Sequence, residues 1–300
     1  LINVAVGVPD GSAPESVKKA VKNAVDITEN HKYPGFRGRP SFKAAIIDFY
    51  KRHYDVDLKD ENIAILYGTK SALVQFPMIF IEPGEGVFLP NPGYADYAAG
   101  VSLAKGVEYD LPLLKENDYL PDYDALDQEE LDNTKLIYLN YPSNPLGSVA
   151  SKKFFDETIN RFKDTDIKIV HDFAYAGFRF EGKHPSILES DPDLSTAMEI
   201  YSFSKSYNMS GFRASFAVGN KEMIDAIHIY QDQTQTGMWG VLQEAAADAL
   251  NREDDFLIAQ RDIFKKRKDM VLKELSEADI PIEPIEGGIF GWIKVPDEFN

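Results

Sequence analysis

Short apolar runs alternate with helix-like segments between residues 63 and 202, and this alternation restricts the fold more than any other feature. The runs expected to form strands are 63–67, 86–90, 106–109, 136–139, 167–170 and 200–202. Helices are expected at 70–81, from Ala95 onward and at 152–163. Such alternation is typical of a mostly parallel sheet with helices on both faces. The sequence therefore predicts an α/β fold, a three-layer sandwich, whose ligands bind where the strands end.

Further helices are expected on either side of this region. They cover 12–28, 41–54, 221–232, 240–250 and 254–277, and Ser41 is a suitable N-cap for the second of them. Strand character is expected at 2–6 and again at 282–295. We expect a domain boundary near 265–280, within the long, highly charged last helix.

The composition excludes several kinds of site and partner. The chain has no cysteine, which rules out disulfides, thiolate metal sites and a cysteine nucleophile. Its formal charge of −17 argues against nonspecific binding of nucleic acid and against adhesion to anionic membranes. No apolar run approaches the length of a membrane span. We therefore expect a soluble, cytoplasmic protein.

A lysine flanked by serines, Lys205, follows the last expected strand, and Arg213 comes eight residues later. Lysine is rarely buried without a partner or a chemical reason. A desolvated lysine has a lowered pKa and can act as a nucleophile that forms a Schiff base. An exposed loop lysine is the alternative that this stretch alone leaves open.

Two further motifs follow expected strands. Gly68, Thr69 and Lys70 form a turn into a helix, where free backbone N–H groups favour a phosphate, although a simple helix cap fits as well. The P-loop pattern is absent. Tyr94 follows the next strand and is placed to stack on a flat ligand or to pack on its own helix.

Asn144 lies in a proline-rich loop after the fourth expected strand, which suits either a fixed hydrogen bond to a ligand or a structural turn. Asp172 follows the fifth strand, where a carboxylate needs a cationic or hydrogen-bonding partner unless it caps a helix. His171 lacks metal-spaced neighbours, so no metal site is expected. A phosphate cradle, an aromatic ring, an amide, a carboxylate, Tyr175 and Lys205 at the ends of one sheet are together the groups that hold pyridoxal phosphate.

At this point the chain resembles the class I and II aminotransferases, which are fold type I pyridoxal-phosphate enzymes. The strongest match is the pattern S-x-S-K-x-x-x-M-x-G-x-R around Lys205, and the likeness extends over nearly the whole chain. It implies a large cofactor-binding domain and a small α+β domain formed by the N-terminal segment and the C-terminal part. It also implies ping-pong exchange of an amino group between an L-amino acid and a 2-oxo acid.

The resemblance implies a role for each motif residue. Lys205 would hold the cofactor covalently and then move the proton, and Asp172 would face the pyridine nitrogen. Phosphate contacts would come from Gly68, Thr69, Lys70, Ser202 and Arg213. Tyr94 would stack on the ring, and Asn144 and Tyr175 would contact the phenolic oxygen. Tyr33 would reach the cofactor phosphate of a second subunit, which implies a homodimer. Substrate contacts would come from Val6, Gly7 and Asn144.

The sequence departs from the family pattern at a few positions. Leu146 stands where the family usually has Thr, Phe173 where it often has Glu, and Ala214-Ser215 replaces the usual small residue and Gly. The family's arginine for the substrate α-carboxylate is expected beyond Asn300, so we expect a fragment of a longer protein. The expected domains are an N-terminal arm at 1–14, a cofactor-binding domain at 15–265 and the start of a small domain at 266–300.

The substrate is left open at this level. The stretch 231–236 carries no arginine, which disfavours a dedicated aspartate enzyme and leaves aromatic, alanine-type and diaminopimelate-type donors. Two other functions are compatible with the same residues: a C–S β-lyase of the same fold, and a non-catalytic module that binds pyridoxal phosphate.

Overall fold

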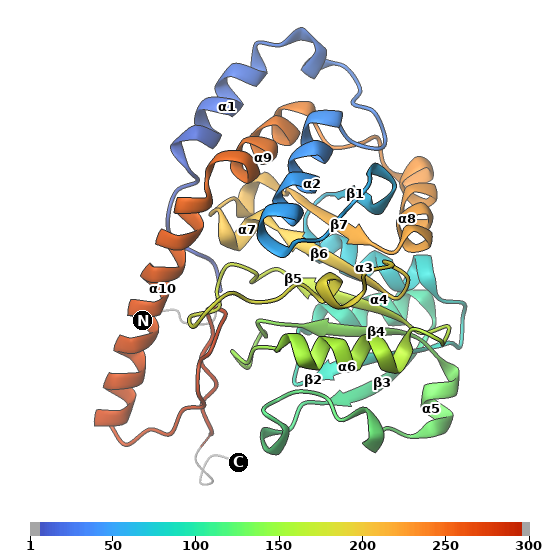
Figure 1. Cartoon of the computed structure of the whole chain (residues 1–300), viewed down its shortest axis with the longest axis vertical. Coiled ribbons are helices and arrows are strands. Elements are labelled where there is room, and N and C mark those ends of the chain that lie inside the picture. The colour runs from blue at the N-terminus through green and yellow to red at the C-terminus, as the bar shows by residue number, and fades with distance from the viewer. Residues whose placement is uncertain (1–6, 296–300) are drawn as a thin grey trace.

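The structure is a computed structural model that describes residues 7–295. In this part of the chain seven strands form one sheet in the order β1-β7-β6-β5-β4-β2-β3 (Figure 1). The strands are β1 (Ile63–Leu66), β2 (Gly86–Asn91), β3 (Val107–Pro112), β4 (Thr134–Asn140), β5 (Lys168–Phe173), β6 (Ala197–Ser202) and β7 (Ser215–Gly219). The six strands expected from the alternation are all present, which confirms the α/β prediction.

Only β7 runs against its neighbours among these strands. It pairs antiparallel with β6 on one side and with β1 on the other, whereas the pairs from β6 through β5, β4 and β2 to β3 are parallel. A parallel neighbour needs a long crossover connection, usually a helix. The connection from β6 to β7 holds just the one-turn helices α7 (Phe203–Ser206) and η6 (Ser210–Phe212), so the chain turns back directly.

Helices cover both faces of the sheet. One face packs on α3 (Thr69–Phe80), α4 (Asp96–Ala104) and α8 (Lys221–Thr234), and the other on α2 (Pro40–Tyr54), α6 (Lys152–Phe162) and α9 (Gly240–Arg252). Each helix turns one apolar stripe toward the sheet, as Phe42, Ile46 and Phe49 do in α2, and these side chains are fully buried. The result is the expected three-layer sandwich.

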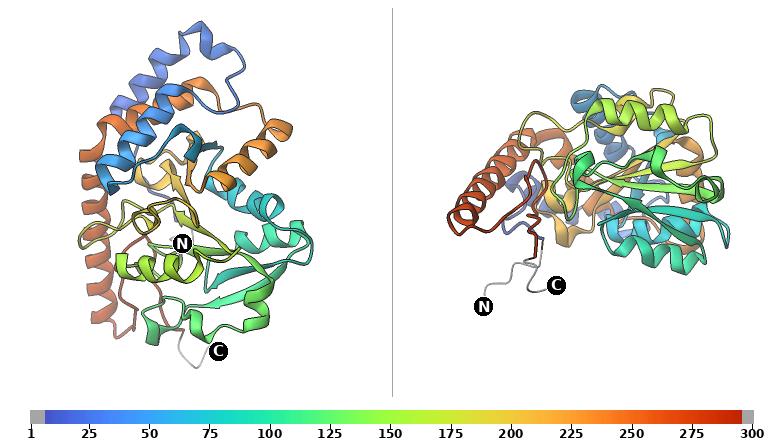
Figure 2. Two further views of the ribbon diagram at one scale, coloured as in Figure 1. Left: turned by 45° about the vertical axis from the view of Figure 1, so that its right-hand side comes forward. Right: turned by 90° about the horizontal axis from the view of Figure 1, so that it is seen from below.

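The two remaining long helices lie outside these layers. α1 (Glu15–Val25) packs on α9, and α10 (Asp254–Glu277) runs along one side of the molecule (Figure 2). Gln260 is the one buried residue within α10. The short elements that complete the described chain are α5 (Gln128–Asn133), η1 (Thr28–His31), η2 (Asp60–Asn62), η3 (Lys115–Asn117), η4 (Tyr123–Ala125) and η5 (Ile187–Ser190). No helix in residues 7–295 is long and apolar enough to cross a membrane.

Three local predictions were wrong. The N-cap of α2 is Arg39, two residues before the expected Ser41, because Pro40 suits the first helical position. Residues 282–295 form isolated bridges with Arg179 and with each other instead of a strand. β5 continues to Phe173, so Asp172 is a strand residue and caps no helix. The strand expected at 2–6 lies outside the described residues.

Candidate active site

A cavity of about 490 Å³ opens where β2, β4, β5 and β6 end. It contains most of the residues that the sequence singles out. Those that line it are Gly7, Thr69, Lys70, Tyr94, Asn144, Asp172, Tyr175, Ser202, Lys205 and Arg213. Further lining comes from Val8, Leu73, Gly93, Ala95, Asn140, Pro145, Ala174, Ser204, Ser210 and Phe290.

Asp172 is a buried carboxylate with a hydrogen bond to each oxygen. The Tyr97 hydroxyl donates to Oδ2 at 2.9 Å, and the Ala174 N–H donates to Oδ1 at 3.1 Å. Burial raises the pKa of Asp172 above its ordinary value, and the bond from Tyr97 opposes this most strongly. A buried carboxylate held in this way is suited to accept a proton-bearing ring nitrogen or another cation.

Lys205 lies on α7, half-buried, where the sequence left an exposed loop open as an alternative. Its Nζ donates to the Gly7 carbonyl oxygen at 2.6 Å, which links it to the N-terminal segment. Burial is the main cause that lowers the pKa of Lys205, the positive charge of Arg213 adds to it, and Asp172 opposes it. A lysine with a lowered pKa supplies more neutral amine, the form that attacks a carbonyl carbon.

Gly68 lies so close to Arg213 that a side chain at position 68 would collide with the guanidinium group. Gly68 has φ +88°, and a Cβ placed there would lie 2.3 Å from Nη2 of Arg213. The Ser202 side chain caps α7 by accepting from the Ser204 N–H at 3.2 Å. The guanidinium, the Ser202 hydroxyl and the start of α3 at Thr69 therefore border one end of the cavity, where they suit a phosphate.

The aromatic and amide groups border the rest of the cavity. The ring of Tyr94 meets Tyr97 edge-on at 5.5 Å, and Tyr175 meets Phe290 in the same way at 5.6 Å. The side chain of Asn144 lies close enough to the hydroxyl of Tyr175 to lower the pKa of that hydroxyl slightly. Burial raises the pKa of Tyr175, so this hydroxyl stays protonated and can donate.

Tyr33 is not among the residues that line this cavity, and 87% of its area is exposed. Val6 lies outside the described residues. Gly68 is not among the lining residues, but its backbone lies directly against the guanidinium of Arg213.

The comparisons with known proteins agree with this geometry. A family model described as aminotransferase class I and II matches residues 1–299. The L-glutamine–4-(methylsulfanyl)-2-oxobutanoate aminotransferase of Bacillus subtilis is 40% identical over an alignment of 302 positions. The alignment covers 100% of this chain and 76% of that protein. The chain belongs to the class I and II aminotransferases.

Other relatives of this aminotransferase are equally well covered. The LL-diaminopimelate aminotransferase of Aquifex aeolicus is 34% identical over 100% of this chain and 78% of its own length. The solved structure of an aminotransferase from Staphylococcus aureus is 52% identical and superimposes with a TM-score of 0.97, over 99% of this chain and 79% of that one. The chain is a pyridoxal-phosphate-dependent transaminase with the α/β fold of these structures.

The cavity of this aminotransferase fits pyridoxal phosphate. The guanidinium of Arg213, packed against Gly68, is a cation suited to the phosphate of the cofactor. The buried carboxylate of Asp172 lines the same cavity and needs a cationic partner such as a protonated ring nitrogen. Lys205 is near enough to both for their charges to change its pKa. Residues 7–295 contain no group of three or more histidine or acidic residues arranged for a metal ion.

Sequence reasoning missed two residues that hold this site together. Tyr97 lies in the first turn of α4, three residues after Tyr94, and the sequence indicates no role for it. Asn140 links two site residues: its Nδ2 donates to the Asp172 carbonyl at 2.8 Å, and its Oδ1 accepts from the Asn144 N–H at 2.7 Å. No pattern in the sequence indicates that second role.

Replacing Tyr97 with phenylalanine is expected to destabilise the cofactor-free aminotransferase by about 1.5–3 kcal/mol at neutral pH, because a hydrogen bond to a carboxylate is lost. The loss raises the pKa of Asp172 further. A carboxyl whose pKa is raised on folding costs stability as the pH rises through that pKa, so the deficit should shrink on acidification. Urea unfolding at about pH 7 and about pH 4 measures both values.

The matched control is Tyr123→Phe. Tyr123 shares its bond, of 3.2 Å, with the neutral hydroxyl of Thr158, so its deficit should not depend on the charge of Asp172. A Tyr97→Phe deficit that is the same at both pH values would contradict the assigned bond.

Proposed function

We propose that the residues around the cavity divide the transamination chemistry among them. Pyridoxal phosphate, when bound, supplies an electron-accepting ring and a reactive carbonyl carbon. Lys205 would hold that carbon covalently, with loss of water, until the amino group of the substrate displaces it. As a neutral amine it would then carry the proton from the substrate α-carbon to the cofactor carbon. Asp172 keeps the ring nitrogen protonated. The observation that carries this assignment is the joint placement of Lys205, Asp172 and Arg213 in one cavity.

Other residues hold and orient the cofactor in this proposal. Ser202, Arg213, Thr69, Lys70 and the backbone at Gly68 bind the phosphate. Tyr94 stacks on the ring, and Asn144 and Tyr175 donate to the phenolic oxygen. The side chains of Asn144 and Tyr175 lie close together in the cavity lining, which supports a shared target for the two. Val6 and Gly7 remain proposed substrate contacts, together with Asn144.

We also propose a homodimer in which Tyr33 reaches the partner's cofactor phosphate. Tyr33 is exposed together with the apolar side chains Phe36, Ile229 and Trp239. The loop that carries Tyr33 and Phe36 is held against α8 by Arg37, which donates to both carboxylate oxygens of Asp232 at 2.6 and 2.5 Å. A fixed apolar surface of this kind favours burial against another subunit. The composition favours a cytoplasmic location.

The domain division stays a proposal: 1–14 and 266–300 in a small domain, and 15–265 in the large one. Contacts between the two outer segments support it, since Arg267 on α10 donates to both oxygens of Asp10 at 3.0 Å. The ring of Phe290 likewise lies beside Gly7. The proposed boundary falls inside α10, which would then connect the domains.

We infer that the amino donor and acceptor carry uncharged side chains. Val8, Leu73 and Phe290 give the cavity apolar walls, and its described cations are Lys70, Lys205 and Arg213, all assigned to the cofactor. A Bacillus subtilis relative, 40% identical, is named for glutamine and 4-(methylsulfanyl)-2-oxobutanoate. Relatives named for LL-diaminopimelate are 33–35% identical and make it the second candidate.

A panel of amino donors tests this inference on the complete protein. Glutamine, methionine, phenylalanine, alanine, aspartate and LL-diaminopimelate are each paired with 4-(methylsulfanyl)-2-oxobutanoate, 2-oxoglutarate and pyruvate. We expect an uncharged donor to exceed aspartate in kcat/KM by about tenfold or more, because an apolar wall leaves a carboxylate unpaired. A preference for aspartate or diaminopimelate would refute the inference. Pyruvate release from cystathionine without a 2-oxo acid would instead indicate the C–S β-lyase.

A further inference from the structure

A histidine and a glutamate form a completely buried pair behind the cofactor site. His171 on β5 and Glu199 on β6 are register partners in the parallel sheet, and both side chains have no exposed area. Successive strand residues point to opposite faces, so His171 lies on the other face of β5 from Asp172. The rings of Phe155 and Phe173 pack on the imidazole at 5.1 and 5.0 Å. Nothing in the proposed transamination chemistry uses this pair.

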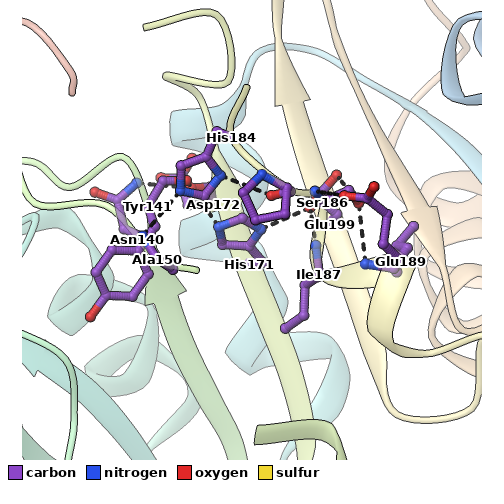
Figure 3. Close-up of polar contacts among 12 residues, drawn as sticks. Asn140, Tyr141, Ala150, His171, Asp172, His184, Ser186, Ile187, Glu189 and Glu199 are labelled. Atoms are coloured by element: carbon purple, nitrogen blue, oxygen red, sulfur yellow. Dashed lines mark hydrogen bonds and ion pairs between the residues drawn. The ribbon is translucent and has the colours of Figure 1, made fainter. Parts of the chain in front are cut away.

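The hydrogen bonds around His171 determine where its protons are. Nδ1 lies 2.8 Å from Oε2 of Glu199, and Nε2 lies 3.0 Å from the Tyr141 carbonyl oxygen (Figure 3). A carbonyl oxygen can only accept, so Nε2 carries a proton. The remaining question is whether the proton between Nδ1 and Glu199 belongs to the histidine or to the carboxyl group.

The hydrogen bonds that Glu199 accepts indicate that this proton belongs to the histidine. Oε1 accepts from the Tyr50 hydroxyl at 2.7 Å and from the Ser186 hydroxyl at 2.9 Å, and Oε2 accepts from the Ile187 N–H at 3.1 Å. Three donors from α2 and the 186–187 segment stabilise the ionised form of a carboxyl group. Glu199 is therefore a carboxylate, and His171 donates from both nitrogens.

His184 provides a contrast within the same cluster. Its Nε2 accepts from the Ala150 N–H at 3.2 Å, so its Nδ1 carries the proton that faces the Pro185 carbonyl at 2.8 Å. Burial, followed by the charge of His171, lowers the pKa of His184 well below its ordinary value. His184 is thus a neutral imidazole stacked 6.3 Å from a charged one.

We propose that His171 is a positioning residue of the cofactor site: an imidazolium, held by Glu199, that fixes the Tyr141 carbonyl and favours the ionised form of Asp172. Tyr141 begins the segment that leads to Asn144, so the bond from Nε2 anchors that loop to β5. His171, the positive member of the pair, directly precedes Asp172 in the chain. Glu199, the negative member, accepts its hydrogen bonds from α2 and from the start of η5. This proposal rests on the assignment of Asp172 to the ring nitrogen.

The electrostatics of the cluster agree with this orientation. The charge of His171 is among the causes that lower the pKa of Asp172 against the effect of burial, after Tyr97 and the Ala174 N–H. The other titratable groups around the pair include Tyr50 and Tyr54 from α2, Tyr201 from β6, Glu189 from η5 and His184 from the preceding loop. Burial raises the pKa of the three tyrosines, so none of them adds a charge near neutral pH.

Nitrogen NMR of the protein labelled with ¹⁵N-histidine tests the protonation directly and needs no cofactor. The chain has five histidines, and His171→Gln and His184→Gln assign the signals of these two residues. We expect both ring nitrogens of His171 to carry protons across about pH 6 to 9, and His184 to show one protonated nitrogen in that range. A single protonated nitrogen on His171 would overturn the proposal, and this holds for the wild-type protein even if a variant does not fold.

The effect on Asp172 is tested by binding of pyridoxal phosphate at a series of pH values. His171→Gln/Glu199→Gln replaces the ion pair with two neutral amides that keep a hydrogen bond. Without the positive neighbour the pKa of Asp172 rises, so affinity for the cofactor should be lost on acidification at a pH about one unit higher than in the wild type. His184→Gln is the matched control and should leave that pH where it is.

If the folded His171→Gln/Glu199→Gln variant lost cofactor affinity at the same pH as the wild type, the proposed effect of the His171 charge on Asp172 would be wrong. That result would leave the aminotransferase assignment intact, because that assignment depends on Lys205 and not on His171. Loss of catalysis by Lys205→Ala together with an unchanged profile in the double variant therefore separates the two conclusions.

Discussion

Lys205→Ala is expected to lower the transamination rate of the complete protein by about 10⁴-fold or more, because one side chain serves both as nucleophile and as proton carrier. No other lysine can take its place: Lys70 also lines the cavity, but its Nζ pairs with Asp96 at 2.9 Å and its side chain is 62% exposed. The lost bond to the Gly7 carbonyl is a single contact at the rim, so the fold should persist.

Covalent attachment gives a second measurement that does not depend on turnover. After incubation with pyridoxal phosphate and reduction with borohydride, the wild type should gain the mass of one reduced cofactor at Lys205, and the variant should gain none. Lys153→Ala is the matched control, since Lys153 is an exposed lysine paired with Glu157 on α6. Activity in Lys205→Ala within about tenfold of the wild type would refute its role.

Asp172→Asn is expected to lower kcat by about 10³-fold, because an amide cannot balance a positive charge on the ring nitrogen. The same change should not destabilise the cofactor-free protein at neutral pH. Burial raises the pKa of Asp172 above its ordinary value, so its charge costs stability that is present at low pH and lost as the pH rises through the folded pKa. An asparagine removes that cost and can still accept from the Ala174 N–H.

Activity and stability should therefore change independently at Asp172. Steady-state kinetics and urea unfolding of the cofactor-free protein, both at about pH 7, measure the two quantities. Asp166→Asn is the control, because Asp166 is 93% exposed just before β5. If Asp172→Asn kept near-normal kcat, or lost activity only because it unfolded, the proposed role would be wrong.

Chemistry and local spacing in the sequence were enough to predict most of the cavity. A glycine turn, Tyr94, Asn144 and Lys205 each follow a strand, Asp172 lies near the end of β5, and parallel strands bring their carboxyl ends to one edge of a sheet. The reach of Tyr33 to a second subunit stays a prediction, because its target does not belong to this chain.

The residues that support the site could not be predicted in the same way. Tyr97 and Asn140 act through contacts with Asp172, 75 and 32 residues away in the chain. Their partners are chosen by strand order and by the packing of α4 against the sheet, which no local pattern encodes.

The sequence by itself determined the alternating α/β architecture and most of the polar groups that line the cavity, because both depend on local periodicity and on residues at the ends of strands. Only the tertiary structure decided the reversed direction of β7, the half-buried setting of Lys205 and the burial of His171 against Glu199. The direction of β7 depends on its pairing with β1 and β6, and the burial of the side chains depends on which distant segments exclude water from them. Burial and partner together set the charge that each of these groups carries.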